Sequence, residues 1–359
     1  MQKKILLLLI IPIFLLLINP AFSLNIASCT NMNSAGTTYD LTTDLSVGGV
    51  DCMVAGANNI ILDCHNHLID GNDAGGVVAV KCVSRNDIII RNCRVNDYYV
   101  PYYFENCDNV TLTNINSTSS PNNYGIWYQQ GRGIYINDYL SDSTGYVEIF
   151  FAGIGYLNNS KTNSISCENT FNITNSEFNG AISIYEPTNN WVYNNKVSSN
   201  VCLWKQGGSC VNTFFYNNLF NCTQIHSEPY DSCDMAFNTT RHSGTRIYGS
   251  GDIGGNYWAN PSGTGISQTC IDANDDCFCD SSYNVFTGHS IGVDYLPYSC
   301  IEPSGCSVSD LCTESAFCFI TSIPQIVMDF VICLSPLYWF VFVIAIVGII
   351  VLVFKNVIR

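Results

Sequence analysis

A pattern of alternating apolar and polar residues recurs between about residues 50 and 225. Each copy reads as one or two polar residues, an apolar residue, any residue, an apolar residue, any residue and then asparagine. The clearest copies occupy residues 58–64, 86–92, 108–114, 169–175, 189–195 and 212–218, with cysteine replacing the last asparagine at Cys64. Their first apolar positions are 60, 88, 110, 171, 191 and 214, and the long gap after residue 110 leaves room for two less regular copies, expected around 134–136 and 147–149.

This spacing predicts short strands stacked one repeat above the next. Alternation with a period of two inside each copy is typical of a strand, and a repeat length in the low twenties is typical of a solenoid. One copy cannot bury its own apolar face, whereas a stack of copies builds a continuous core. We therefore predict an all-β fold, a right-handed parallel β-helix. A β-sandwich of hairpins is the alternative, but among Asn-Gly turns only Asn179-Gly180 fits it.

The repeated asparagines predict a second feature of the stack. The alternation places Ile88, Ile90 and Asn92 on the inside of one coil, and residues 110, 112 and 114 on the inside of the next. A buried amide is costly unless both of its halves are hydrogen-bonded, and coils about 4.8 Å apart allow each amide to bond the next. We expect an internal ladder of asparagines at a turn; surface turn residues in a left-handed conformation are the alternative. The expected members are Asn92, Asn114, Asn175, Asn195 and Asn218.

The amino-terminal end has the layout of a secretory signal peptide. Lys3 and Lys4 precede an apolar run over residues 5–18, and small residues follow at Ala21 and Ser23. This layout predicts a signal peptide over residues 1–23, removed after Ser23. A retained amino-terminal anchor is the alternative.

The carboxyl-terminal end predicts a membrane span. Residues 337–354 are apolar throughout and are followed by Lys355 and Arg359. Extended slightly upstream, this stretch crosses a hydrocarbon core of about 30 Å at about 1.5 Å per residue. We expect a single transmembrane helix over 334–354 with residues 355–359 in the cytoplasm. A buried core helix and a lipid-anchor signal are the alternatives.

Charge and cysteine usage point to an exported protein. The formal net charge is −15, which argues against a nucleic-acid partner because nucleic-acid binding needs a positive surface. Nineteen cysteines without any CxxC pair are typical of an oxidising compartment. Pairing cannot be deduced from the sequence, but Cys29 with Cys52 is the favoured bridge. Six N-glycosylation sequons fit a cell-surface glycoprotein: Asn109, Asn116, Asn158, Asn172, Asn221 and Asn238.

Four segments resemble a known family. Residues 62–71 (LDCHNHLIDG) resemble the first coil of surface β-helix proteins related to pectate lyases and the NosD-like group. Residues 254–258, 272–280 and 293–297 are similar to the segment that closes such helices, notably in archaeal cell-surface proteins. The resemblance covers about residues 28–299 and implies the β-helix fold. It implies little about activity, because the family includes lyases, hydrolases, binding proteins and scaffolds.

Pattern and resemblance together predict a domain order. Residues 24–57 form an amino-terminal cap, 58–253 the parallel β-helix, and 254–300 a closing segment with an acidic loop. Residues 301–333 form a cysteine-rich stalk that leads to the membrane.

The acidic loop is the sharpest candidate metal site. Oxygen-bearing side chains at Asp272, Asn274, Asp276 and Asp280 follow the start of a calcium loop. Cys277 replaces the glycine such a loop normally has, and Tyr283 stands where a carboxylate is expected, so an acidic loop fixed by disulfides is the alternative. Calcium is the only cofactor we expect. His65 and His67 could bind a transition metal, with a polar turn as the alternative.

Clustered aromatic residues are candidates for contact with sugars. Planar rings on a rigid stack can pack against sugar faces while amides bond the hydroxyl groups, although core packing explains aromatic residues equally well. The candidate residues are Tyr98, Tyr99, Tyr102, Tyr103, Trp127 and Trp204.

These features predict a membrane-anchored cell-surface glycoprotein that serves recognition, adhesion or envelope structure. Its expected partners are the membrane and extracellular glycans or other envelope proteins. The alternative is a membrane-tethered polysaccharide lyase or glycoside hydrolase. Carboxylates converging in a groove would favour the enzyme, but the acids of the repeats are scattered and no catalytic residues can be assigned.

Overall fold

The computed structural model describes residues 22–119, 124–141, 149–208, 210–227, 233–249, 251–286 and 292–299. All of them lie in one compact unit, Met1–Pro303. The predicted stalk, transmembrane helix and tail lie outside the described residues, as does the predicted signal peptide except for Phe22 and Ser23. Among the described residues, no helix combines the length and the apolar character that crossing a bilayer requires.

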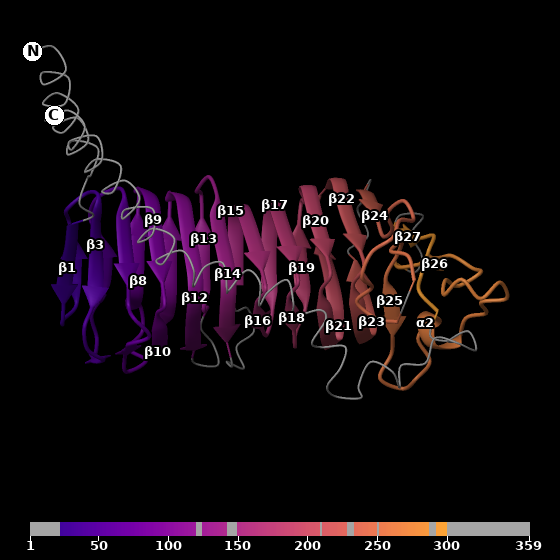
Figure 1. The fold of residues 1–359 in the computed structure, drawn as a ribbon, viewed down its shortest axis with the longest axis horizontal. Coiled ribbons are helices and arrows are strands. Elements are labelled where there is room, and N and C mark those ends of the chain that lie inside the picture. Colours follow the sequence, from indigo (N-terminus) through magenta and orange to yellow (C-terminus); the bar gives the residue numbers. More distant parts are fainter. Residues whose placement is uncertain are drawn as a thin grey trace, which may run out of the picture. The chain divides into compact units, whose positions relative to one another are not determined.

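The strands run parallel and stack coil upon coil along the long axis of Figure 1. Ile60 pairs with Ile88, and Ile88 pairs with Val110, so each repeat lies one coil above the preceding one. Corners in every coil divide the strands among three faces, here called faces 1, 2 and 3. The predicted all-β parallel β-helix is confirmed.

Face 1 holds ten strands or parts of strands. They are β2 (Thr30–Met32), β5 (Met53–Ala55), β8 (Val78–Val83), β11 (Val100–Glu105), β13 (Ile126–Gln129), the first parts of β15 (Ile149–Asn158) and β17 (Ile165–Thr174), β19 (Ile182–Tyr185), and the last parts of β21 (Lys196–Gln206) and β23 (Leu219–Ser227).

Face 2 carries the repeated motif seen in the sequence. It is built from β1 (Phe22–Ile26), β3 (Thr37–Leu41), β6 (Ile60–Asp63), β9 (Asn86–Arg91), the first part of β12 (Asp108–Ser119), β14 (Ile134–Ser141), the last parts of β15 and β17, β20 (Thr188–Tyr193), β22 (Cys210–Tyr216) and β24 (Cys233–Ala236).

Face 3 has mostly short strands. These are β4 (Leu45–Ser46), β7 (Leu68–Asp70), β10 (Arg94–Tyr98), the last parts of β12 and β14, β16 (Lys161–Thr162), β18 (Glu177–Phe178), the first parts of β21 and β23, and β25 (Tyr257–Ala259).

The coils begin before the predicted residue 58, because β1 already pairs in parallel with β3. After β25, the chain leaves the stack to form the short helix α2 (Ile266–Thr269) and an antiparallel pair, β26 (Tyr283–Asn284) with β27 (Val293–Asp294). Disulfides cross-link neighbouring coils, and the favoured pair Cys29–Cys52 is confirmed. The other described bridges are Cys64–Cys93, Cys82–Cys107, Cys202–Cys222 and Cys270–Cys279.

A buried ladder of polar side chains follows the corner between faces 2 and 3. In each step, a side-chain oxygen accepts the backbone N–H of the residue one coil earlier: Ser176 N–H donates to Asn195 Oδ1 (2.9 Å), and Asn195 N–H donates to Asn218 Oδ1 (3.0 Å). The ladder comprises Ser160, Ser176, Asn195, Asn218, Asn256 and Asp294. All six are less than 5% exposed. The ladder supplies partners for backbone N–H groups that the corner would otherwise leave unpaired.

Asn92, Asn114 and Asn175 do not belong to this buried ladder, so the single internal ladder we predicted is wrong for them. They lie one position earlier, at the outer rim of the corner, where the residue must adopt a left-handed conformation; their φ values lie between 51° and 54°. Asparagine tolerates this conformation, which was the alternative considered from the sequence. The outer residues still bond each other, for example Asn114 Nδ2 to Asn92 Oδ1 at 2.8 Å.

Three strand assignments also differ from the prediction. Trp191 pairs with Asn172 and is 42% exposed, so Val192, not Trp191, faces the core in β20. The same shift holds in β22, where Phe214 pairs with Trp191 and the fully buried Phe215 faces the core. The second irregular copy on face 2 is Gly155–Asn158, which pairs with Ile134–Asn137. Ile149, which we expected there, lies on face 1 opposite Ile126 and Ile165.

Candidate functional site

A column of outward-facing residues runs along face 1. Alternation in each strand sends Phe104, Tyr128 and Phe151 into the core and their neighbours outward. Because the strands are in register, the outward neighbours align across the coils. In chain order the column reads Tyr103, Trp127, Phe150, Ser166, Ser183, Trp204 and His226. Its residues are aromatic near both ends and small in the middle.

The first end of the column is a fixed aromatic cluster. The ring centroids of Trp127 and Phe150 are 5.1 Å apart, and Tyr124 meets Trp127 edge-on at 4.3 Å. Trp127 Nε1 donates to Gln129 Oε1 at 3.1 Å, and Gln129 Nε2 donates to the Tyr103 hydroxyl at 3.1 Å. Burial raises the pKa of Tyr103, and its hydrogen bond to Glu105 adds to the shift. These bonds hold the rings in place at the surface.

The small residues form the floor of a groove of about 600 Å³. Ser166 and Ser183 lie at its base, and Trp204, 38% exposed, stands at one end. Three coil steps separate Phe150 from Trp204, roughly 14 Å at about 4.8 Å per step. Among the described residues that line the groove, none is charged; amide and hydroxyl groups come from Asn163, Asn179, Ser199, Asn200 and Gln206. The described lining therefore offers the ring of Trp204, hydroxyl groups and amides but no ionic partner.

The structure brings together three of the six predicted sugar-contact residues, Tyr103, Trp127 and Trp204, in this column. Tyr98 and Tyr102 are fully buried, so their assignment to a surface contact is wrong; each occupies an inward position on its strand. Tyr99 is 42% exposed but lies at the corner between β10 and β11, away from the column. Phe150, Ser166 and Ser183 were not predicted, because only the register between coils aligns them with Trp204.

In the predicted calcium loop, backbone N–H groups and Arg241 already bond the side-chain oxygens that would bind the ion. Asp272 accepts the N–H groups of Asp276 (3.1 Å) and Cys277 (2.8 Å), and Asn274 also accepts the Asp276 N–H. Asp276 pairs with Arg241 at 2.6 Å, and Asp280 accepts the Ala273 N–H. The carboxylates of this loop do not converge on one point as a set of three. Calcium binding here stays a prediction.

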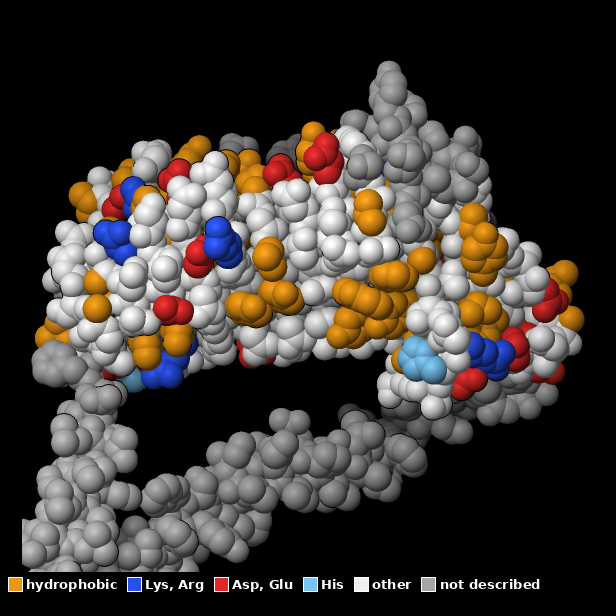
Figure 2. Space-filling view, turned by 90° about the horizontal axis from the view of Figure 1, so that it is seen from above, with side chains coloured by type: hydrophobic (Ala, Val, Ile, Leu, Met, Phe, Trp, Pro, Cys, Tyr) orange, Lys and Arg blue, Asp and Glu red, His pale blue; other side chains and the backbone are white. Residues whose placement is uncertain are grey.

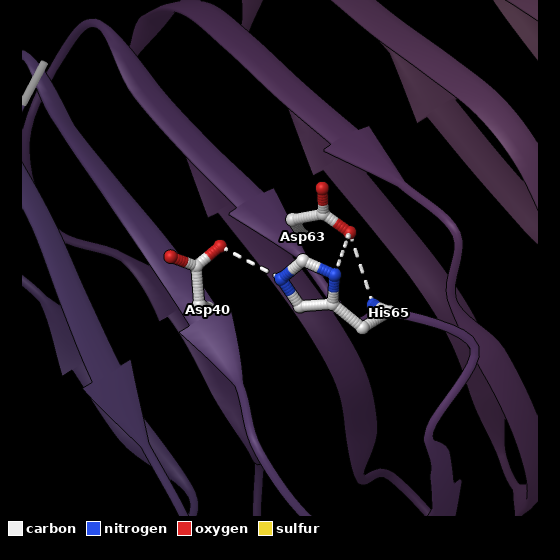
Figure 3. Close-up of side chains that lie close together, drawn as sticks. All are labelled: Asp40, Asp63 and His65. Carbon is white, nitrogen blue, oxygen red and sulfur yellow. Dashed lines mark hydrogen bonds and ion pairs between the residues drawn. The ribbon is translucent and has the colours of Figure 1, made fainter.

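A second cluster lies at the corner after β3 and β6 (Figure 3). His65 stands between Asp40 and Asp63, and one ligand atom from each residue lies within 4.8 Å of the others. His65 Nε2 is 3.0 Å from Asp40 Oδ1, and Nδ1 is 3.7 Å from Asp63 Oδ1. Among the described residues, no other set of three His, Cys, Asp or Glu side chains converges in this way.

Asp63 is the fixed member of this cluster. Desolvation alone would raise its pKa, but hydrogen bonds from Asn92, the His65 N–H and Arg91 outweigh burial and hold the pKa below the usual value. Asp63 is 4% exposed, whereas the His65 side chain is 54% exposed. The imidazole is therefore accessible and packs beside a carboxylate that stays ionised.

Uncharged polar groups cover most of the side of the stack shown in Figure 2, with apolar patches and scattered charges among them. This agrees with a chain in which only 12% of the residues are charged.

Comparison with known proteins gives one family. The model of a family described as periplasmic copper-binding protein (NosD) matches residues 25–263. No curated protein and no solved structure gives a significant match.

Proposed function

The chain belongs to the NosD family of right-handed β-helix proteins, and from this membership and the groove on face 1 we propose that it is an exported recognition protein that binds neutral oligosaccharides. The observation that carries the proposal is the column on face 1, where aromatic residues flank a floor of serines. Sugar rings present an apolar face that packs on aromatic side chains, and hydroxyl groups that bond amides. The uncharged lining of the groove suits a neutral oligosaccharide. It offers no opposite charge to the carboxylates of uronates or to the sulfates of sulfated sugars.

Two further observations support an exported, surface-directed role. Five described disulfides fit an oxidising compartment, and the family description names the periplasm. The six sequons lie outside the strands of face 1: Asn109, Asn158 and Asn172 are on face 2, Asn116 and Asn221 on face 3, and Asn238 beyond β24. Glycans attached at these sites would leave face 1 open. Anchoring by a single carboxyl-terminal span is part of the same proposal.

Replacing Trp204 with alanine should weaken oligosaccharide binding roughly tenfold, because the described groove lining then loses its aromatic side chain. The full-length chain, purified in detergent, would be applied to an array of neutral oligosaccharides, and the best ligand titrated by calorimetry. Trp191→Ala is the matched control, since Trp191 is similarly exposed (42% against 38% for Trp204) but lies on face 2. Equal loss in both variants, or binding only to charged glycans, would contradict the proposal.

The lyase or hydrolase alternative makes a different prediction. Hydrolysis needs two carboxylates beside the scissile bond, and the described groove lining has none. Elimination needs a base, and the described lining has no charged side chain to act as one. We expect mass spectrometry of the array ligand after prolonged incubation to show intact oligosaccharide. Shortened or unsaturated products would favour the enzyme.

One observation favours copper as a second ligand. The described methionines, Met32, Met53 and Met235, are all buried, so the described surface offers no thioether to copper(I). The cluster at His65 offers imidazole and carboxylate, which copper(II) accepts. The family description names copper binding, and we propose that this chain binds copper(II).

A further inference from the structure

The fold places Asp40, Asp63 and His65 together for a simple reason. Asp40 and Asp63 are register neighbours at the ends of β3 and β6, so they lie one coil apart on the outside of face 2. The chain then turns sharply, with φ of 48° at His65 and 65° at Asn66. This turn carries the imidazole back beside the Asp40 carboxylate of the preceding coil.

The three side chains differ in how many of their oxygen and nitrogen atoms are still accessible to a ligand. Asp63 already accepts Arg91 Nε (2.7 Å), Asn92 Nδ2 (3.0 Å) and the His65 N–H (3.0 Å). Asp40 Oδ1 bonds only the imidazole among the described residues, and its side chain is 20% exposed. The accessible pair is therefore His65 Nε2 with Asp40 Oδ1.

We propose that His65 Nε2 and Asp40 Oδ1 hold a copper(II) ion, with Asp63 as the positioning residue for the imidazole. This inference rests on the copper proposal above and is independent of the oligosaccharide proposal. The 3.0 Å between the two atoms suits adjacent ligands of one ion, since ligands about 2 Å from an ion at roughly a right angle are about 3 Å apart. Water completes the set, because half of the His65 side chain is open to solvent.

Asp63 serves the pair through the other ring nitrogen. Histidines that bind metals usually direct their second N–H at a carboxylate, which fixes the tautomer and the ring orientation. Asp63 Oδ1 accepts the His65 backbone N–H at 3.0 Å, which fixes the residue on the turn. The same oxygen lies 3.7 Å from Nδ1, longer than a hydrogen bond, but its negative charge favours a proton on Nδ1 and leaves the Nε2 lone pair for the ion. Arg91 balances the charge of Asp63 from its far oxygen, Oδ2.

His67 provides a matched comparison on the same turn. Its Nδ1 is 3.0 Å from Asp44 Oδ1, which also accepts the Leu68 N–H at 2.9 Å. Backbone and imidazole hydrogen bonds lower the pKa of Asp44, and among the described residues no second carboxylate converges on His67. His67 is thus a histidine on the same turn with one aspartate beside it, and it lacks the second carboxylate that His65 has.

The test titrates copper(II) sulfate into the full-length chain in detergent, followed by calorimetry and by electron paramagnetic resonance. We expect one ion per chain with nitrogen and oxygen ligands. We also expect affinity to fall at least tenfold in His65→Ala and severalfold in Asp40→Asn, with His67→Ala unchanged. Melting followed by circular dichroism checks that each variant folds.

Different outcomes would overturn the site at His65 and the copper-binding function. Binding by the wild type that survives His65→Ala would overturn this site and leave the copper function standing. Equal loss in His65→Ala and His67→Ala would also overturn the site, because the ion would then lie between the two imidazoles. Absence of binding by the wild type would overturn both, whereas the oligosaccharide titration would be unaffected.

Discussion

Asn218→Leu is expected to lower the free energy of unfolding by about 4 kcal/mol. Asn218 Oδ1 accepts the N–H and the Nδ2 of Asn195, both at 3.0 Å, and Asn218 Nδ2 donates to Val192 O (2.8 Å) and Asn256 Oδ1 (2.9 Å). Leucine fills a similar volume but makes none of these bonds. Each buried group left without a partner costs about 1–3 kcal/mol. Urea denaturation followed by circular dichroism measures the loss.

The control separates the ladder from a general intolerance of leucine. Asn31 is an exposed strand residue on face 1, in β2, and Asn31→Leu should change the free energy of unfolding by less than about 0.5 kcal/mol. A similarly small change for Asn218→Leu would mean that the buried amides do not hold the coils together.

Stability should depend on pH through Asp294, the last member of the ladder. Burial raises the pKa of Asp294 to about 7, although hydrogen bonds from Trp258, Leu296 and Asn256 oppose the shift. The unfolded chain has a pKa near 3.8 at this residue, so between these values the folded chain holds a proton that the unfolded chain releases. This contribution to stability is full below about pH 4 and is lost as the pH rises through about 7.

Asp294→Asn removes this titration while keeping the shape of the side chain. The free energy of unfolding of the wild type relative to Asp294→Asn should fall by up to about 4 kcal/mol between about pH 4 and pH 8. Denaturation of both proteins at several pH values in this window gives the difference directly. A difference that stays constant across the window would show that Asp294 does not titrate there.

The repeated motif made the β-helix predictable, because alternation and a repeat length near 22 residues leave few other folds. What the motif could not resolve is which of two neighbouring asparagines faces inward. In residues 194–195 and 217–218 the first asparagine bonds the outer ladder and the second the buried one. In the earlier coils Cys93 and Ser176 occupy the buried position, so Asn92 and Asn175 are left at the rim. The local pattern around Trp191 failed for the same reason: a shift of one residue exchanges the two faces of a strand.

The groove was only partly predictable. Tyr103, Trp127 and Trp204 stand out as aromatic residues near loops, but nothing in the sequence separates them from Tyr98 and Tyr102, whose rings fill the core. Ser166 and Ser183 matter because they are small where their register neighbours are aromatic. That contrast exists only once the coils are aligned. His65 was noticed as one of a pair, whereas Asp40 came from the preceding coil and could not be assigned to it.

A crystal structure of the chain with the oligosaccharide selected on the array tests the recognition function most directly. We expect sugar density over Ser166 and Ser183, with sugar rings packed against Trp204 and reaching toward Phe150. Sugar bound on face 2 or face 3, with the serine floor empty at saturating ligand, would contradict it.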